Sequence, residues 1–236
     1  MKVHHRVLGE GTPLVILHGL FGYSDNWQSH AKKLAEYYQV ILVDQRNHGH
    51  SDWSEEFSYP LMAEDLKELL DELQLDQIIL LGHSMGGKTA MHFAQMYPEY
   101  LQKLIVVDIG IKTYASHHDS ILKGLKSVSG QAMASRALAD QSMAEHIESV
   151  GVRQFLAKNL YWKEKGKLGW RMNIPVLERE MDAILSGIPK EEVLLPTLFI
   201  RGMMSDYILD DDVDELEELF PDMKLHSIDN AGHWVH

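Results

Sequence analysis

The chain has 236 residues, of which 45% are hydrophobic and 24% are charged, so neither a disordered chain nor a fibrous repeat is plausible. It contains no cysteine, which excludes a disulfide framework, a thiolate metal site and a cysteine nucleophile. The formal net charge of −13 argues against a nucleic-acid-binding protein, because such proteins neutralise phosphates with lysine and arginine.

The start of the chain lacks the apolar core of a secretory signal. No apolar run approaches the roughly 18 to 20 residues that a transmembrane helix needs. We therefore expect a cytoplasmic protein without a membrane span.

Short aliphatic runs alternate with helical patterns in the first half of the chain. The runs cover residues 14–17, 40–43, 78–81 and 104–107. Uninterrupted runs of this length are typical of strands that are covered on both faces. The amphipathic stretches between them predict helices joined to the strands by right-handed crossovers. The sequence thus predicts an α/β fold with a mostly parallel central sheet flanked by helices.

The alternation stops after the fourth run. Residues 111–190 show helical stretches but no aliphatic strand run. A strand pattern resumes at residues 194–200 and is followed by a helix and a last strand near 225–228. We expect a core formed by residues 1–110 and 191–236, with an all-helical cap inserted over residues 111–190.

The pentapeptide Gly-His-Ser-Met-Gly occupies residues 82–86, directly after a predicted strand and before a predicted helix. A serine in such a tight turn needs small neighbours, because side chains at Gly82 and Gly86 would collide with the strand and the helix. The turn exposes the hydroxyl at the carboxyl end of the strand. Ser84 is therefore the candidate nucleophile.

A second glycine-rich turn, His-Gly-Leu-Phe-Gly at residues 18–22, follows the first aliphatic run and belongs to the same sheet edge. Acyl transfer needs N–H donors where a carbonyl oxygen becomes an oxyanion. The amides of Leu20 and Met85 are the expected donors of this oxyanion hole. The amide of Phe21 is an open alternative to that of Leu20.

A serine nucleophile needs a base. Among the fourteen histidines, His233 lies on a loop after the last predicted strand, at the same edge as Ser84. This order, with the histidine downstream of the serine, is typical of a hydrolase built on a strand–turn–helix elbow. His233 is therefore the expected general base.

Four strings together carry a family resemblance: residues 18–22, Asp-Gln-Arg-Asn-His-Gly-His-Ser at 44–51, Gly-His-Ser-Met-Gly-Gly at 82–87, and Ala-Gly-His-Trp-Val-His at 231–236. The chain resembles α/β-hydrolases over nearly its whole length. It resembles in particular the small bacterial esterases typified by YbfF, which are similar to the mitochondrial ABHD-type hydrolases.

The resemblance implies an esterase or thioesterase, with acyl-CoA as one candidate substrate, that forms an acyl-enzyme and needs no cofactor or metal. A C–C bond hydrolase or lyase with the same catalytic residues remains an alternative. A hydrolase-fold ligand receptor with slow turnover is a second alternative, from another functional class.

The acid that orients the histidine has two candidates. In most α/β-hydrolases it lies three residues after a glycine that ends the strand following the cap; counted from Gly202, that position is Ser205, and Asp206 comes one residue later. In the resembled group the acid directly follows the strand before the cap, and a serine occupies the later position. The resemblance thus implies Asp108 as the acid and Ser205 as a fourth member, with Asp206 as the alternative acid.

The resemblance also implies substrate-binding residues. The tyrosine after the fourth-member serine corresponds to Tyr207, and His117 and His118 stand near the place of a basic cap residue. Phe21 is expected to line the same site. Residues 151–171 contain six basic side chains and one acidic side chain, which form either a solvated face or a basic rim for an anionic substrate such as an acyl-CoA.

Similar hydrolases continue into a final helix that packs on the sheet, whereas this sequence stops three residues after His233. If that helix is absent from the protein, we expect exposed apolar sheet surface and reduced stability.

Overall fold

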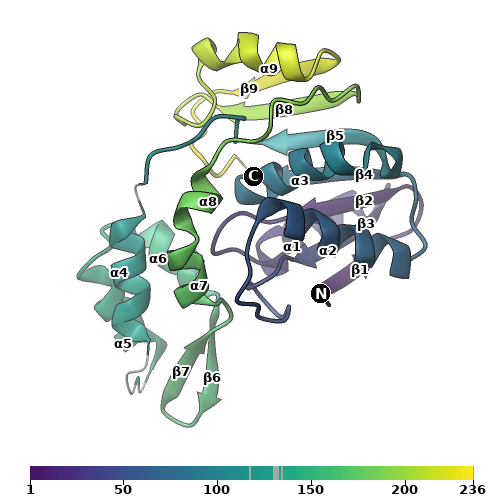
Figure 1. Ribbon diagram of the computed structural model, residues 1–236. Helices are drawn as coiled ribbons and strands as arrows, with labels where there is room; N and C mark the ends of the chain where they lie inside the picture. The colour runs from purple at the N-terminus through teal and green to yellow at the C-terminus, as the bar shows by residue number, and fades with distance from the viewer. Residues whose placement is uncertain (117, 130–132, 134, 236) are drawn as a thin grey trace.

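A central sheet organises the protein in the computed structural model, which describes residues 1–116, 118–129, 133 and 135–235 (Figure 1). Within these residues the sheet has seven strands in the order β1-β3-β2-β4-β5-β8-β9. The strands are β1 (His4–Leu8), β2 (Pro13–Leu17), β3 (Gln39–Asp44), β4 (Ile78–His83), β5 (Leu101–Val107), β8 (Thr197–Gly202) and β9 (Met223–Ile228). Only β1 runs antiparallel to its neighbour among them. The predicted mostly parallel sheet is confirmed.

Alternate residues of the strands face two different layers of helices. Val15 and Leu17 of β2 pack in an apolar cluster with the buried residues of α2, α3 and α9. Leu14 and Ile16 pack in a second apolar cluster, on the side of the sheet that α1 covers. These helices are α1 (Gln28–Leu34), α2 (Tyr59–Glu72), α3 (Met85–Met96) and α9 (Val213–Leu219). Short 3-10 turns cover Ser24–Trp27, Pro98–Tyr100 and Asp210–Asp212. Successive side chains of a strand point to opposite faces of the sheet, and here both faces are covered by helices. The strands are therefore aliphatic at successive positions.

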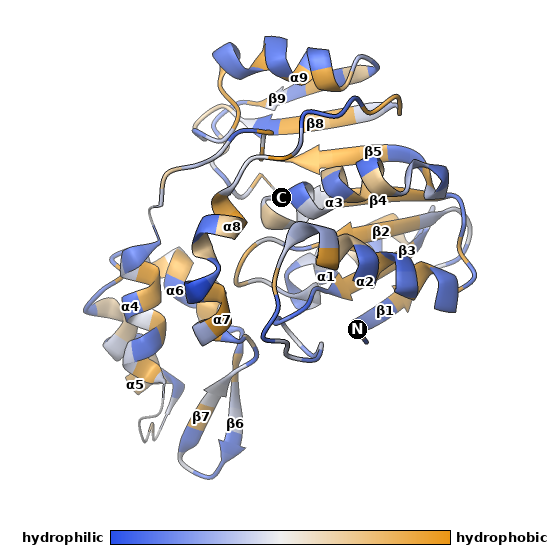
Figure 2. Ribbon diagram, in the orientation of Figure 1, coloured by the Kyte–Doolittle hydropathy of each residue, from blue (hydrophilic) through white to orange (hydrophobic). Residues whose placement is uncertain are grey.

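The hydropathy pattern follows this layering. Figure 2 shows β5 as a largely hydrophobic strand inside the sheet and α9 as a helix with much hydrophilic surface. On the α1 side of the sheet, Ile79, Ile105 and Ile200 are only partly buried. No helix in the described ranges is both long and apolar enough to cross a membrane.

One strand was not predicted and several strand boundaries differ from the predictions. β1 was missed because its residues His-His-Arg-Val-Leu form no aliphatic run and the strand lies at the edge of the sheet. β5 begins at Leu101 instead of 104. β8 begins at Thr197 instead of 194, after Pro196, which has no N–H to donate to a neighbouring strand. β9 begins at Met223, slightly before the predicted 225.

The cap segment, which we define as the residues between β5 and β8, lies to one side of the sheet in Figure 1 and returns to it through α8. Its elements are α4 (Asp119–Val128), α5 (Arg136–Ala144), α6 (Val150–Ala157), β6 (Leu160–Glu164), β7 (Lys167–Trp170), α7 (Ile174–Arg179) and α8 (Met181–Leu185). One apolar cluster joins these helices to Phe21, Tyr59 and Met85 of the core. The cap segment therefore packs directly over the turns that follow β2 and β4.

The expectation of an all-helical cap was wrong, because β6 and β7 form an antiparallel hairpin. Its outer residues Trp162, Lys163 and Glu164 are exposed, so the strand carries aromatic and charged side chains in place of an aliphatic run. Gly166 turns the chain with a φ of +77°. A two-stranded ribbon of this kind lacks the hydrophobic signal by which the core strands were predicted.

Candidate active site

Ser84 occupies a strained turn between β4 and α3, with φ 54° and ψ −121°. A Cβ at Gly82 would lie 2.1 Å from the carbonyl oxygen of Gly86, and a Cβ at Gly86 would lie 2.5 Å from the carbonyl oxygen of Leu17. Both positions therefore require glycine. The backbone outlier is of the kind that clusters at functional sites, and it lifts the Ser84 side chain out of the sheet.

The Ser84 hydroxyl meets a histidine that is itself bound to a buried carboxylate. Ser84 Oγ lies 3.0 Å from His233 Nε2, and His233 Nδ1 lies 2.8 Å from Asp108 Oδ2. Asp108 follows β5 and is fully buried. When Nδ1–H donates to this carboxylate, the lone pair of Nε2 faces the serine, as proton removal requires. The three side chains come from the carboxyl ends of β4 and β5 and from the loop after β9.

The two candidate acids occupy different environments. Asp108 Oδ1 accepts the N–H of Gly202 at 2.9 Å, and Oδ2 accepts the hydroxyl of Ser205 in addition to His233. Asp206 is exposed to solvent. The structure thus brings Asp108 and Ser205 to the histidine and places Asp206 on the surface.

The turn after β2 presents one backbone amide toward this edge. Gly22 N–H donates to the carbonyl oxygen of Gly19 at 2.9 Å, and Phe21 has a φ of +59°. The N–H of Phe21 donates to His48 Nε2 at 3.2 Å, so it is already engaged. No acceptor in the described part of the chain takes the N–H of Leu20.

The second amide at this edge belongs to Met85, the first residue of α3. The first N–H groups of a helix have no intrahelical acceptor, and the helix dipole favours negative charge there. Leu20, Ser84 and Met85 line one small cavity, so both N–H groups belong to residues at the edge that carries the nucleophile. This pair has the composition of an oxyanion hole.

The comparisons with known proteins identify the family of the chain. A sequence profile of the α/β hydrolase fold matches residues 12–132. The chain belongs to the α/β-hydrolase family. It is 37% identical to the sn-1-specific diacylglycerol lipase ABHD11 of Danio rerio, over 97% of this chain and 74% of that protein. It is 37% identical to Esterase YbfF of Escherichia coli (strain K12), over 95% of this chain and 87% of that protein.

Among solved structures, the fold of this α/β-hydrolase is similar to that of an esterase from a marine microorganism. The TM-score is 0.96 and the sequence identity 42%, and the match covers 100% of this chain and 94% of the other. The predicted resemblance to the YbfF-like esterases and the ABHD-type hydrolases is confirmed.

A cavity of about 600 Å³ opens in front of Ser84 in this hydrolase. Tyr207, His118 and Phe21 all line it, as do residues of α4 and α6 from the cap segment. The Tyr207 ring stacks on that of His233, with centroids 4.1 Å apart and an interplanar angle of 23°. His117 lies outside the described residues. The volume lies within the range of about 300–1,000 Å³ that is typical of small-molecule sites.

The basic side chains of residues 151–171 do not gather at this cavity. Lys158 is the one that lines it within the described chain. Arg153 is bound to Asp140 inside the cap segment, and Arg171 lies beside His50 and over a tyrosine ring. Their dispersion gives little support to a basic rim.

His48 is a residue of the site to which sequence reasoning assigned no role. It is fully buried, its Nδ1 donates to the carbonyl oxygen of Arg46 at 2.9 Å, and its Nε2 accepts the N–H of Phe21. Burial lowers the pKa of His48 to about 3, so the ring stays neutral and its Nε2 remains an acceptor. The string at residues 44–51 contained this histidine, but nothing in the spacing of that string indicated which turn it contacts.

The neutral state of His48 makes the stability of the hydrolase pH-dependent. The unfolded chain protonates this histidine near its ordinary pKa of about 6.5, whereas the folded chain does not until about pH 3. Below about pH 6.5 the unfolded state therefore binds the additional proton, and acid lowers the free energy of unfolding by about 1.4 kcal/mol per pH unit for this group. Urea unfolding between about pH 7 and pH 5 should show a shallower dependence in His48→Gln than in the wild type. Identical slopes would contradict the buried neutral state.

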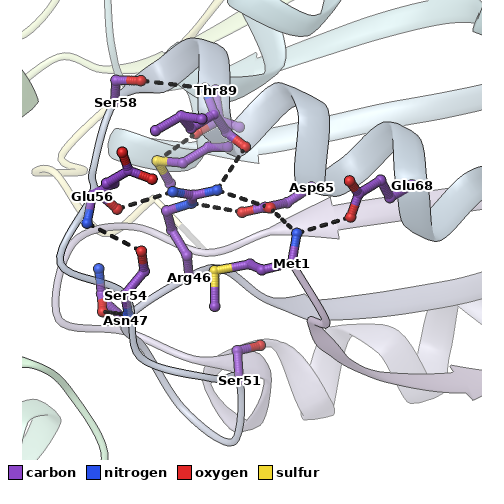
Figure 3. A network of polar contacts seen from close by, with 12 residues as sticks. Met1, Arg46, Asn47, Ser51, Ser54, Glu56, Ser58, Asp65, Glu68 and Thr89 are labelled. Atoms are coloured by element: carbon purple, nitrogen blue, oxygen red, sulfur yellow. Dashed lines mark hydrogen bonds and ion pairs between the residues drawn. The ribbon is translucent and has the colours of Figure 1, made fainter.

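The loop that carries His48 is anchored by a buried ion pair (Figure 3). Arg46 Nε donates to Asp65 Oδ2 at 2.6 Å, and a terminal guanidinium nitrogen donates to Asp65 Oδ1 at 2.9 Å. Arg46 also donates to the carbonyl oxygens of Glu56 and Leu61. The bidentate pair thus joins the loop after β3 to α2.

We expect Asp65→Asn to destabilise the hydrolase strongly. The amide leaves the buried charge of Arg46 without its counterion, and breaking such a pair costs about 3–5 kcal/mol. The control is Glu178→Gln, which removes the exposed pair with Lys126 and should cost less than about 1 kcal/mol. Urea unfolding at neutral pH measures both, and equal losses would show that the buried pair does not anchor the loop.

His83 is a further residue of the site. Its Nε2 lies 2.9 Å from the backbone carbonyl oxygen of His233, and the two rings are 4.8 Å apart. His83 is buried beside the nucleophile and holds the loop that carries His233. No pattern in the sequence indicates this contact, because it joins residues 150 positions apart.

Proposed function

We propose that this α/β-hydrolase is a serine ester hydrolase, with Ser84 as nucleophile and His233 as general base. The observation that carries the proposal is the continuous hydrogen-bonded line from Ser84 Oγ through His233 to buried Asp108, at 3.0 and 2.8 Å. A serine hydroxyl is a weak nucleophile, and an adjacent oriented imidazole is the arrangement that activates it.

The reaction proceeds in two halves. His233 Nε2 takes the proton as Ser84 Oγ attacks the ester carbonyl carbon, and it then gives that proton to the departing alcohol oxygen, which leaves an acyl-enzyme on Ser84. A water molecule, deprotonated by the same nitrogen, attacks the acyl-enzyme, and the imidazolium then returns the proton to Ser84 Oγ as the carboxylic acid leaves. The carboxylate of Asp108 keeps Nδ1–H toward itself and stabilises the imidazolium in both halves.

The backbone N–H groups of Leu20 and Met85 stabilise the negatively charged carbonyl oxygen of each tetrahedral intermediate. Loss of one such donor costs about 10²- to 10³-fold in kcat in comparable sites. His48 acts indirectly, because it holds the N–H of Phe21 and with it the turn that carries the Leu20 amide.

The names of the relatives support an ester as substrate, since one is a diacylglycerol lipase and another an esterase. An acyl-CoA thioester is the weaker candidate, because Lys158 alone of the basic run lines the cavity within the described chain. We also propose that residues 1–110 and 191–236 form the core and that residues 111–190 form a cap that covers Ser84. The apolar cluster shared by the cap segment and Phe21 supports this division.

A panel of p-nitrophenyl esters and acyl-CoA thioesters tests the proposal. We expect rapid release of p-nitrophenol with a burst when acylation outruns deacylation. Slower turnover of every thioester than of the matched ester is the second expected result. A protein that binds a small ligand tightly but turns over no ester would be a receptor, and the proposal would be wrong.

A further inference from the structure

Ser84 lies where two cavities of very different size meet. The large one has a volume of about 600 Å³, and a second one, on the side of α8, has a volume of about 30 Å³. Leu20, Ser84, His118 and Tyr207 line both cavities. The nucleophile and Leu20, whose N–H is one expected oxyanion donor, therefore border both spaces.

The catalytic groups divide between the two cavities. Of the described residues, His233 lines the large cavity and not the small one, whereas Met85 lines the small one and not the large one. In an acyl transfer the departing alcohol oxygen must lie at the base, because His233 Nε2 protonates it. The alcohol part of an ester therefore occupies the large cavity, and the acyl part extends from the carbonyl carbon into the small one.

We propose that the small cavity is the acyl site and that the preferred substrates are esters of short carboxylic acids with bulky, largely apolar alcohols. This inference rests on the proposed ester hydrolysis. A cavity of about 30 Å³ holds about two water-sized groups, which is the size of the carbon chain of an acetyl or propionyl group. The large cavity accepts an apolar alcohol against Ile121, Val152, Phe155 and Leu156 of the cap segment.

The walls of the small cavity are held in place by hydrogen bonds to the backbone. Tyr59 Oη donates to the carbonyl oxygen of Ile184 at 2.6 Å, and Lys88 Nζ donates to that of Leu185 at 3.3 Å. Tyr114 Oη donates to the carbonyl oxygen of Tyr207 at 2.8 Å. The first two bonds join α2 and α3 to α8, and the third joins the start of the cap segment to the loop after β8.

The hydrogen bonds between the residues that line the small cavity oppose its expansion. A longer acyl chain would have to separate Tyr59 from its carbonyl acceptor or displace Lys88 from the carbonyl oxygens of Lys112, Leu185 and Ser186. A buried polar group without a partner is costly. The limit on acyl length is therefore built into the contacts between the core and α8.

The first test varies the acyl chain at a constant leaving group. The kcat/KM of the wild type is measured with p-nitrophenyl acetate, propionate, butyrate, hexanoate and octanoate, each below its aggregation concentration. We expect acetate and propionate to be the best substrates and hexanoate to be at least tenfold worse, because a methylene that a pocket cannot hold costs about tenfold or more. A kcat/KM that rises toward hexanoate or octanoate would overturn the proposal.

The second test uses a pair of matched variants. Leu185→Ala enlarges the small cavity and should raise the ratio of hexanoate to acetate kcat/KM by about tenfold. Ile121→Ala changes only the large cavity and should leave that ratio within about twofold while it alters the preference between ethyl and naphthyl acetates. The ratio is taken within one preparation, so partial unfolding cancels. If Leu185→Ala does not fold, Ile184→Val gives the same test in a milder form.

The outcomes separate this inference from the function on which it rests. If no ester is hydrolysed, the proposed function fails. If esters are hydrolysed but long acyl chains are preferred, or if Ile121→Ala shifts the acyl ratio and Leu185→Ala does not, the assignment of the two cavities fails while the proposed function stands.

Discussion

Ser84→Ala should lower the kcat for ester hydrolysis by about 10⁴- to 10⁶-fold, because no other group at the site can form the acyl-enzyme. The side chain of Ser84 makes no cap hydrogen bond to α3, and its packing is that of one small hydroxyl. Folding should therefore be preserved. Steady-state kinetics with p-nitrophenyl acetate measures the loss, and thermal unfolding shows whether the variant is folded.

The matched control for Ser84→Ala is Ser205→Ala, which also removes one hydroxyl near His233. Ser205 donates to the Asp108 oxygen that contacts His233 Nδ1 and does not form the acyl-enzyme, so its loss should cost far less than that of Ser84. A Ser84→Ala variant that keeps a tenth or more of wild-type kcat, as an order of magnitude, would rule out the serine mechanism.

Asp108→Asn should lower kcat by about 10⁴-fold with little change in KM, the size of effect known for the same substitution in a serine protease. An asparagine amide that donates toward His233 Nδ1 favours the tautomer with the proton on Nε2. That tautomer cannot accept the proton of Ser84. Kinetics across the pH range of the assay would show the loss at every pH.

Asp206→Asn is the control for Asp108→Asn. Asp206 is exposed, whereas Asp108 is fully buried and contacts His233 at 2.8 Å. We expect wild-type kcat within about twofold for Asp206→Asn, as for most surface substitutions. An active Asp108→Asn together with an inactive Asp206→Asn would reverse the assignment of the acid.

The parts of the fold that were predicted have local signals. The side chains of β2 to β5 alternate between two buried faces of the sheet. Burial of both faces requires consecutive aliphatic residues, and such runs are visible in the sequence itself. The turn around Ser84 was predictable for the same reason, since close backbone contacts dictate Gly82 and Gly86. The β6–β7 hairpin was missed because it is exposed on its outer strand and needs no aliphatic run.

The parts of the site that could not be predicted are assembled from distant segments. The role of His48 depends on a contact with Phe21, 27 positions away, and that of His83 on a contact 150 positions away. The positions of Asp108 and Asp206 in the sequence did not decide which of them is the acid, because both follow strands that end at the same edge of the sheet. The small cavity joins residues of α2, α3, α8 and the loops after β2, β5 and β8, so no single stretch of sequence reveals its size.

The most direct test of the central claim is covalent labelling with a fluorophosphonate, followed by peptide mapping by mass spectrometry. We expect one phosphonyl group per chain, on the peptide that contains Ser84, with complete loss of ester hydrolysis and no labelling of Ser84→Ala. Labelling of another serine, or full ester hydrolysis after Ser84 has been labelled, would contradict a serine hydrolase mechanism at this site.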